Sequence, residues 1–219
     1  NKSYLYSDLP YYFFKYFLEN KHQVSLDKLL KKIILNKVGA NFTTYNPLKS
    51  YTSNKIVPSE IDDYFRKDTL LGYVHDMGAA MLGGVAGHAG LFSNANDLAI
   101  IMQMLLNEGY YGGQQFFSPS TVRLFTTRHT ECSRRGIGFD MKELNDNRSQ
   151  NMCTQASDNT FGHLGFTGTC AWADPDNNLV FIFLTNRTYP SMRRNKWSGE
   201  DFRPRIQSII YDALNTTIK

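Results

Sequence analysis

The 219-residue chain is 42% hydrophobic and 20% charged, with a net charge of +4. This length and composition indicate a globular domain, or a large part of one, rather than a tail or a linker. The basic pairs Lys31-Lys32, Arg134-Arg135 and Arg193-Arg194 are far apart in the sequence. We expect them on solvated surfaces, so we expect no nucleic-acid partner. No run approaches the roughly 18 apolar residues that a membrane span needs, so we expect no membrane span in this chain.

The first two predicted elements are helices. Residues 9 to 20 are apolar and aromatic almost all round, which is typical of a buried helix. Residues 26 to 38 are amphipathic, with Ser25 as N-cap and Gly39 beyond the end. The predicted apolar face of this second helix consists of Leu26, Leu29, Leu30, Ile33 and Ile34. We expect the two helices to form a hairpin.

The middle of the chain is less regular. Residues 40 to 74 show no clear period, so we expect an irregular segment with one short strand near Ile56. Helices are predicted over 74 to 84, 93 to 109 and 118 to 128, the second of them clearly amphipathic.

After residue 128 the pattern changes to strands. Residues 135 to 141 alternate like a strand, and 169 to 186 predict a β-hairpin that turns at 174 to 178. Residues 200 to 214 predict a closing helix that Pro204 interrupts early. Helices followed by antiparallel strands and a last helix predict an α+β domain whose sheet is covered by helices.

Two segments are rich in glycine. FGHLGFTGT, residues 161 to 169, leads into an apolar strand, where glycine marks a bend or a place where a backbone or a ligand comes close. GGVAGHAGLFS, residues 83 to 93, fits neither GxGxxG nor GxxxxGK[ST]. We therefore expect a turn packed against the core there, not a phosphate loop.

For the cysteines and for the possible metal ligands we expect structural roles. Cys132, Cys153 and Cys170 lack CxxC spacing, so we expect packing roles rather than a disulfide framework or a zinc site. The candidate ligands for a metal ion are His75, Asp76, His88 and His163. They lack the close spacing of motifs such as HExxH, so we expect no metal.

Ser25 and Lys28 form one match to SxxK. We expect a helix N-cap followed by a surface lysine, because the cap role commits the hydroxyl to helix amides. A rearranged catalytic site built on this pair is the weaker alternative.

Three segments together resemble the serine β-lactamase and penicillin-binding protein superfamily, in its class C-like branch of esterases and D-amino-acid peptidases. They are Tyr6 to Asp8, Val74 to Leu98 and Gly162 to Arg187. The resemblance runs over essentially all of residues 1 to 219, taken as a single C-terminal portion of such a domain. It implies an α+β fold of the β-lactamase/transpeptidase type, an antiparallel sheet flanked by helices with a helical subdomain, and no cofactor.

The family's mechanism uses an SxxK serine and lysine, a Tyr-x-Asn motif, and a Lys-Thr-Gly strand or a histidine variant of it. The resemblance implies that Tyr6 assists proton transfer and that Asp8 stands where the family has asparagine. His163, with Leu164 and Gly165, matches Lys-Thr-Gly in a His-x-Gly form. The resemblance implies a catalytic role for His163, with its ring facing the reacting carbonyl or a substrate carboxylate. Both Asp8 and Leu164 depart from the family pattern.

The resemblance also implies a substrate-binding role for Gly165, Phe166 and Thr167. The backbone N–H of Phe166 is expected to be one donor of an oxyanion hole. We expect the glycines to let substrate lie along the strand edge by backbone hydrogen bonding.

In the family the SxxK motif precedes Tyr-x-Asn, whereas here Tyr6 stands close to the first residue. We therefore expect the nucleophile, its lysine and the first strands upstream of Asn1, so that this chain alone is inactive. Its partners would be that missing N-terminal portion and a small-molecule or peptide substrate.

The parent protein is expected to be a serine hydrolase that forms an acyl-enzyme on an ester, an amide or a D-amino-acid peptide of cell-wall origin. By resemblance its location would be periplasmic or otherwise extracytoplasmic. A non-catalytic binding or accessory module of the same fold is the alternative, which Asp8 and Leu164 favour.

Overall fold

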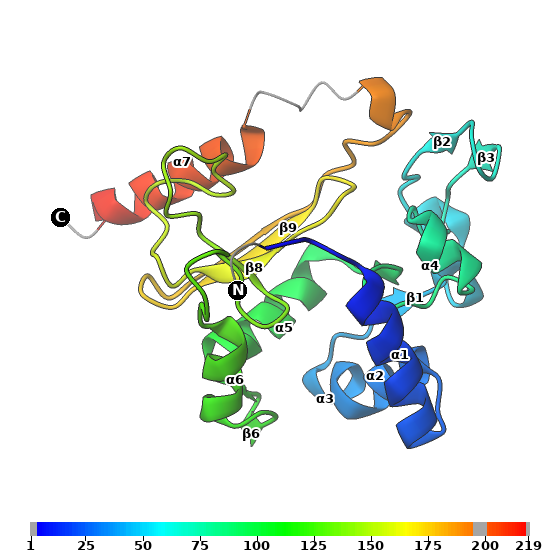
Figure 1. The fold of residues 1–219 in the computed structure, drawn as a ribbon, viewed down its shortest axis with the longest axis horizontal. Helices are drawn as coiled ribbons and strands as arrows, with labels where there is room; N and C mark the ends of the chain where they lie inside the picture. Colours follow the sequence, from blue (N-terminus) through cyan, green and yellow to red (C-terminus); the bar gives the residue numbers. More distant parts are fainter. Residues whose placement is uncertain (1–3, 195–200, 218–219) are drawn as a thin grey trace. The chain divides into compact units, whose positions relative to one another are not determined.

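A computed structural model gives the fold of residues 4–194 and 201–217, without the side chains of Arg194 and residues 215–217 (Figure 1). The chain forms two compact units. The sheet unit comprises Tyr4 and residues 99–184 and 201–217, and the helix-and-loop unit comprises residues 5–98 and 185–194. Each unit is described by itself. The expectation that residues 1 to 219 belong to a single domain stays a prediction.

The sheet unit contains a four-stranded antiparallel sheet in the order β10-β9-β8-β7. The strands are β7 (Asp140–Met141), β8 (Phe161–Leu164), β9 (Cys170–Asp174) and β10 (Leu179–Phe183). β9 and β10 pair along their whole length, from Leu179 opposite Asp174 to Phe183 opposite Cys170. The predicted hairpin is therefore confirmed.

The strand predicted over 135 to 141 is much shorter than expected. Only Asp140 and Met141 pair with β8. Gly138 has a φ of +83°, and the N–H of Gly136 donates to the carbonyl of Phe139 at 3.1 Å, so the chain turns before it can extend the ladder.

Side chains of the sheet alternate between its two faces, as a period of two requires. On one face Trp172 and Phe181 pack with Tyr211 of α7 (Phe202–Thr217). On the other face Ala173 and its neighbours pack with Met102 of α5 (Ala95–Leu106). Figure 1 shows α7 and α5 on opposite sides of the strands. The expectation of an antiparallel sheet covered by helices is confirmed.

The helices of the sheet unit have the ends that their sequences predict, with one correction. Asn94 Oδ1 accepts from the N–H of Asp97 at 2.8 Å at the start of α5. Ser118 Oγ accepts from the N–H of Thr121 at 3.2 Å at the start of α6 (Pro119–Thr126).

Pro204 does not interrupt α7, because it is the third residue of the helix, where a backbone N–H would have no intrahelical acceptor. Residue 200, where that helix was expected to begin, lies outside the described residues. A small hairpin of β5 (Tyr110–Tyr111) and β6 (Gln114–Gln115) lies between α5 and α6.

The helix-and-loop unit begins with the predicted helical hairpin. α1 (Leu9–His22) contacts α2 (Leu26–Leu30), and Glu19 Oε1 accepts from the N–H of Leu26 at 2.8 Å. The helix continues as a π-helical turn, Lys31–Leu35, and as α3 (Asn36–Val38).

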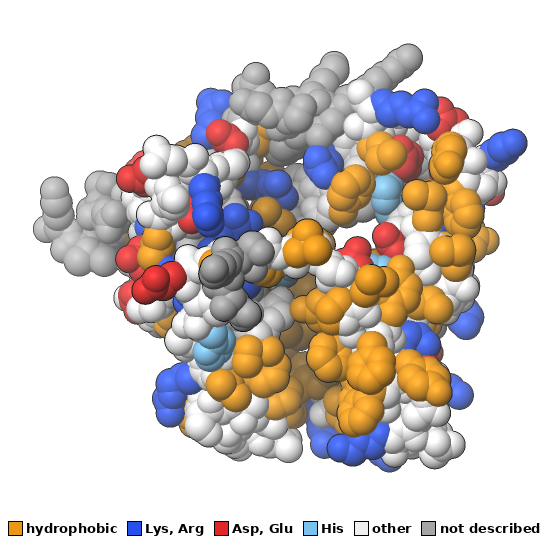
Figure 2. Space-filling view, viewed as in Figure 1, with side chains coloured by type: hydrophobic (Ala, Val, Ile, Leu, Met, Phe, Trp, Pro, Cys, Tyr) orange, Lys and Arg blue, Asp and Glu red, His pale blue; other side chains and the backbone are white. Residues whose placement is uncertain are grey.

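Two expectations about the helical hairpin are wrong. Within α1 no side chain is buried, and hydrophobic side chains gather over it on the surface (Figure 2). In the second helix Ile33 is 50% exposed while Leu35 is 3% exposed. The π turn closes i→i+5 instead of i→i+4 and so rotates the residues that follow it to another face.

The rest of this unit consists of short elements. β1 (Thr44–Tyr45) pairs with β4 (Leu91–Phe92), and β2 (Ile61–Asp62) pairs with β3 (Asp68–Thr69). The helical pieces are the 3-10 turns Pro47–Lys49, Ser53–Lys55 and Met192–Arg194, and α4 (Met77–Met81). The predicted strand near Ile56 is wrong, because the N–H of Ile56 closes a 3-10 turn on the carbonyl of Ser53.

Carboxylates hold these irregular segments by accepting from backbone N–H groups. Asp97, 1% exposed, accepts through Oδ2 from the N–H groups of Phe42 and Thr43 at 2.7 and 2.8 Å. Asp62 accepts from three consecutive N–H groups, and the bond from Phe65 contributes most to a lowered pKa of Asp62. Glu60 Oε1 accepts from the N–H of Met192 at 2.9 Å, which ties the returning chain to the unit.

Candidate active site

The sequence-predicted residues fall into two groups, one in each unit. His163, Gly165, Phe166 and Thr167 belong to the sheet unit, and the segment from Tyr6 to Asp8 belongs to the helix-and-loop unit. Each group is built from the residues that position it.

His163 lies on β8, opposite Ala171 of β9. The neighbouring Gly162 is needed for this pairing, because a Cβ at that position would lie 1.9 Å from the carbonyl oxygen of Ala171 and 2.7 Å from the Trp172 ring. Close approach of β9, and not a ligand, therefore explains Gly162.

A tight turn follows His163 and leads into β9. The N–H of Gly165 donates to the carbonyl of Thr169 at 2.7 Å, and the N–H of Gly168 donates to the carbonyl of Gly165 at 3.0 Å. Gly168 has a φ of +113°, a conformation that side chains disfavour. Phe166, next to the half-buried Thr167, is 60% exposed on this turn. The glycines thus have internal roles, and substrate binding by Gly165, Phe166 and Thr167 stays a prediction.

The imidazole of His163 has a partner at each nitrogen. Nδ1 lies 2.7 Å from the carbonyl oxygen of Leu164, and Nε2 lies 2.6 Å from Nη1 of Arg135. A carbonyl can only accept and a guanidinium can only donate. The ring is therefore the tautomer with its proton on Nδ1, and its Nε2 lone pair accepts from Arg135.

Arg135 belongs to a charged cluster centred on Asp140, which is fully buried. Arg134 donates to Asp140 through Nε at 2.6 Å and through Nη2 at 3.0 Å, and this hydrogen bonding raises the pKa of Arg134. Nε of Arg135 lies 3.5 Å from Asp140 Oδ1. The amide of Asn151 also donates to Asp140, at 3.3 Å. Two guanidinium groups and an amide thus compensate one buried carboxylate.

This cluster corrects the expectation that the Arg134-Arg135 pair is a solvated surface patch. The two side chains are only 26% and 18% exposed and bind Asp140 and His163. Arg135 is the site-related residue that the sequence reasoning missed. The available signal was Asp140 on an apolar strand, because a buried aspartate needs a cation nearby.

Tyr6 and Asp8 lie just before α1 in the helix-and-loop unit. Tyr6 is 56% exposed, and Asp8 occupies the N-cap position of α1, where its carbonyl accepts from the N–H of Tyr11 at 2.9 Å. Ser7 Oγ accepts from the N–H of Leu9 at 3.2 Å. These local hydrogen bonds fix the backbone conformation of the segment that contains Tyr6 and Asp8.

The first turn of α1 is held by Tyr12 against the turn that follows α4. The rings of Tyr12 and His88 are stacked, with centroids 4.5 Å apart. The Tyr12 hydroxyl fills the space that a Cβ of Gly78 would occupy. Burial first, and then the carboxylates of Asp76 and Asp8, raise the pKa of Tyr12. A stacked, half-buried tyrosine therefore anchors the helix that begins just after the predicted catalytic residues.

The turn over residues 83 to 93 is structural, as its sequence predicts, and His88 is bound within it. His88 Nε2 lies 2.8 Å from Asp76 Oδ1, which also accepts from the N–H of Ala79 at 2.7 Å as N-cap of α4. Burial opposes ionisation of Asp76, but these hydrogen bonds outweigh it and lower the pKa of Asp76.

The other residues considered for chemistry have structural partners. His75 Nε2 lies 2.7 Å from Glu60 Oε2, and no group of three or more His, Cys, Asp or Glu side chains in the described residues is arranged to hold a metal ion. Ser25 occupies the N-cap position of α2 without a side-chain capping bond, and Lys28 is exposed. The predicted cap interaction of Ser25 is therefore wrong, although its position is right.

Two of the cysteines pack as predicted. Cys153 and Cys170 belong to the apolar cluster around Trp172, and Cys132 is half-buried. Burial raises the pKa of Cys170 to about 11, so its thiol stays protonated at neutral pH and is a poor nucleophile.

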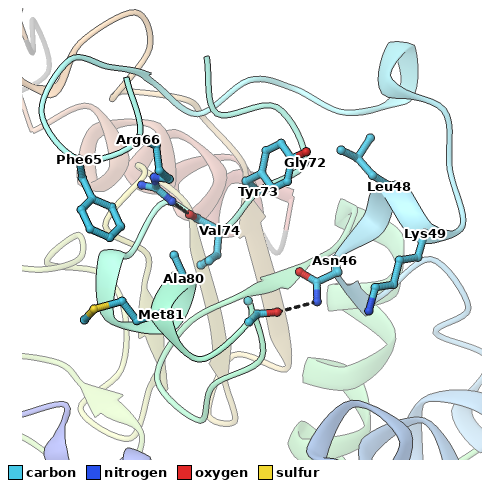
Figure 3. Close-up of a pocket in the computed structure, with 12 residues that line it drawn as sticks. Asn46, Leu48, Lys49, Phe65, Arg66, Gly72, Tyr73, Val74, Ala80 and Met81 are labelled. Atoms are coloured by element: carbon cyan, nitrogen blue, oxygen red, sulfur yellow. Dashed lines mark hydrogen bonds between the residues drawn. The ribbon is translucent and has the colours of Figure 1, made fainter. Parts of the chain in front are cut away.

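An open pocket of about 600 Å³ lies in the helix-and-loop unit (Figure 3). Its walls include Leu48, Phe65, Tyr73 and Met81, with Lys49 on the same side as Leu48. Neither Tyr6 nor Asp8 lines it. Its lining, mostly apolar with Asn46, Lys49 and Arg66, assigns no chemistry by itself, and we do not place the reaction there.

Comparison with known proteins defines the class to which this architecture belongs. A chain described as a beta-lactamase from Mycobacterium bovis superposes with a TM-score of 0.65, at 16% sequence identity, over 97% of this chain and 65% of its own length. A penicillin-binding protein homologue from Caulobacter crescentus gives a TM-score of 0.53 at 18% identity, over 78% of this chain and 49% of its own. The fold is therefore that of the β-lactamases and penicillin-binding proteins, as expected.

The family model described as Beta-lactamase matches residues 1–202, and the chain belongs to this family. A protein of Escherichia coli K12 with the name "Putative D-alanyl-D-alanine carboxypeptidase" is 36% identical over 197 residues, which is 84% of this chain and 45% of that protein. A protein of the same name from Salmonella heidelberg is 35% identical over 206 residues, 88% of this chain and 47% of its own length. The chain thus spans about half the length of these relatives. No described helix has the length and apolar character that crossing a membrane requires.

Proposed function

We propose that the whole protein is a serine hydrolase that forms an acyl-enzyme on a peptide ending in D-amino acids, or on a related ester or amide. The observation that carries this proposal is the match to the Beta-lactamase family over residues 1–202, which includes both predicted groups of site residues. The names of the relatives in E. coli and Salmonella favour D-alanyl-D-alanine peptides among these substrates. Such peptides belong to the cell wall, so we further propose an extracytoplasmic, for example periplasmic, location.

In this proposal the sequence-predicted residues have the roles that the family resemblance implies. Tyr6 moves protons to and from the nucleophile and the leaving group, and Asp8 accepts a hydrogen bond beside it. The backbone N–H of Phe166 stabilises the oxyanion of the tetrahedral intermediate, and Gly165 and Thr167 contact the substrate.

The role of His163 follows from its hydrogen bonds. Because Nε2 accepts from Arg135, the ring cannot take a proton from a nucleophile while this bond persists. We therefore assign His163 to shaping the site, and leave proton transfer to Tyr6 and to the lysine of SxxK. We propose that this lysine and the serine nucleophile belong to a part of the protein outside these 219 residues, since the relatives are about twice as long.

The test is covalent labelling of the full-length protein with a fluorophosphonate and with a fluorescent penicillin, followed by identification of the labelled residue by mass spectrometry. We expect one labelled serine, in an SxxK sequence outside the 219 residues, and release of D-alanine from a D-alanyl-D-alanine peptide. Tyr6→Phe should lower the labelling rate at least tenfold, whereas Ser25→Ala, the matched control, should leave it unchanged. Labelling of Ser25 would instead support the rearranged SxxK site.

A non-catalytic binding module of the same fold is the second candidate, which Asp8 and Leu164 favour as departures from the family pattern. It predicts that the full-length protein binds D-alanyl-D-alanine peptides without acylation or turnover. Saturable binding by calorimetry, together with no mass shift after incubation with either probe, would establish it and exclude the hydrolase.

A further inference from the structure

Arg135 contacts both a predicted site residue, His163, and the buried anchor of the charged cluster, Asp140. Its Nη1 lies 2.6 Å from His163 Nε2, and its Nε lies 3.5 Å from Asp140 Oδ1. Arginine presents its donors in a rigid planar fork that fixes the direction of two partners at once, whereas lysine has a single flexible ammonium.

The topology of the sheet brings Arg135 to this place. β7 and β8 are antiparallel, with Asp140 opposite Gly162. Toward the end of β8, where His163 lies, the partner chain therefore runs back from Asp140 into the loop that contains Arg135. A register shift at β7 would move Arg135 away from the imidazole.

The loop that contains Arg135 is fixed by backbone contacts. The N–H of Ile137 donates to the carbonyl of Phe125, the penultimate residue of α6, at 3.0 Å, and a Cβ at Gly136 would lie 2.4 Å from the same carbonyl oxygen. The N–H of Arg135 donates to Ser133 Oγ at 3.1 Å. The guanidinium thus extends from a rigid segment, as an orienting group requires.

We propose that Arg135 is the positioning residue of His163: its guanidinium, held by the buried Asp140, keeps the imidazole in the Nδ1–H tautomer and fixes the ring against the carbonyl of Leu164. Loss of Arg135 frees the Nε2 lone pair, so the ring can rotate, change tautomer or accept a proton from solvent. The expected effect of Arg135 on turnover rests on the proposed function, whereas its expected effect on the tautomer of His163 does not.

The tautomer is measured on the full-length protein labelled with ¹⁵N-histidine, using long-range ¹H–¹⁵N correlation, with the His163 signals assigned by their loss in His163→Gln. We expect a proton on Nδ1 and an unprotonated Nε2 in the wild type. Arg135→Gln should shift the ring toward a tautomer mixture. The matched control is Arg148→Gln, because Arg148 is 54% exposed and pairs only loosely, at 3.8 Å, with Glu143.

Kinetics on the same variants give the second readout. We expect Arg135→Gln to lower kcat about 10- to 100-fold with a smaller change in KM, as loss of an orienting partner does elsewhere. Methylguanidinium at millimolar concentration should restore part of the rate of Arg135→Ala, but should not affect Arg148→Gln.

The outcomes separate the two proposals. A wild-type His163 with its proton on Nε2, or an unchanged tautomer in Arg135→Gln, overturns the role of Arg135. If the full-length protein shows no acylation but the tautomer results are as expected, the proposed function fails while the positioning role holds. If Arg135→Gln does not fold, the wild-type tautomer and the Arg135→Lys variant decide, since lysine replaces the rigid fork with one flexible ammonium and should still loosen the ring.

Discussion

The two units of this chain are stabilised by different interactions. The sheet unit has a regular antiparallel sheet whose faces are packed against α5 and α7, with Trp172 only 1% exposed at the centre of one cluster. The helix-and-loop unit has two-residue strands and short turns, which are held by carboxylates such as Asp97 and Asp62 that accept from backbone N–H groups. Burial of apolar area thus mainly stabilises the sheet unit, and hydrogen bonding of backbone N–H groups mainly stabilises the helix-and-loop unit.

The largest expected effect comes from Trp172→Ala in the sheet unit. Removal of this buried ring should cost about 3–5 kcal/mol of unfolding free energy, because the surrounding cluster cannot fill the cavity. Amide hydrogen exchange with mass spectrometry should show faster exchange in residues 161–183 and little change in residues 40–50. Equal acceleration in both segments would mean that the units are not stabilised separately.

The corresponding change in the helix-and-loop unit is Asp97→Ala. It leaves the N–H groups of Phe42 and Thr43 and the Thr43 hydroxyl without their common acceptor, and should cost about 3 kcal/mol. Exchange should now accelerate in residues 40–50. Asp97→Asn keeps one oxygen and loses mainly the charge assistance, so about half the effect is expected. If Ala and Asn behave alike, hydrogen bonding by Asp97 is not what holds the segment.

A smaller effect concerns Asp174, a buried carboxylate of the sheet unit. Asp174 is 1% exposed and accepts from the Ser157 hydroxyl at 2.6 Å and from the Tyr211 hydroxyl of α7 at 2.5 Å. Burial opposes its ionisation, but the hydrogen bonds from Ser157 and Tyr211 outweigh it and lower the pKa of Asp174 to about 2. Because the pKa of Asp174 is lower in the folded state than in the unfolded state, ionised Asp174 stabilises the fold by about 2 kcal/mol. This stabilisation is complete above pH ~4 and is lost as the pH falls toward 2.

This pH dependence can be measured by urea unfolding between pH 7 and pH 3. Trp172 fluorescence reports on the sheet unit when every other tryptophan of the full-length protein, including Trp197, is replaced by phenylalanine. Asp174→Asn should be less stable than its parent at pH 7, and the difference should shrink as the pH falls. Asp176→Asn, two residues away and exposed, is the control. A stability difference that does not depend on pH would contradict the depressed pKa.

The sequence predicted the sheet unit better than the helix-and-loop unit, for a physical reason. The hairpin over 169 to 186 consists of two apolar runs separated by polar turn residues at 174 to 178, a local pattern that predicts two paired strands. In residues 40 to 74 the determinants are single bonds such as those of Asp62 and Asp97, which have no period and can join residues 55 or, between Glu60 and Met192, 132 positions apart. Propensity alone therefore placed a strand near Ile56, where the chain makes a 3-10 turn.

Prediction of the candidate site was limited in the same way. The residues that motif resemblance identified, such as Tyr6 and His163, are those that the family pattern contains. Arg135 belongs to no motif, and only the pairing of Asp140 with Gly162 brings it to the imidazole. A partner that depends on strand register cannot be read from a linear pattern.

The π-helical turn over Lys31–Leu35 has a consequence for how this chain is aligned with its relatives. An i→i+5 turn contains one residue more than the α-helical turn that it replaces. The helix from Leu26 to Val38 can therefore lose one residue at this turn while Ser25 and Gly39 keep their places at its ends. In a relative that lacks this extra residue, the alignment gap belongs within the turn. A gap beyond Gly39 would assign the buried Val38 to the wrong face, and a gap before Leu26 would do the same to the buried Leu29.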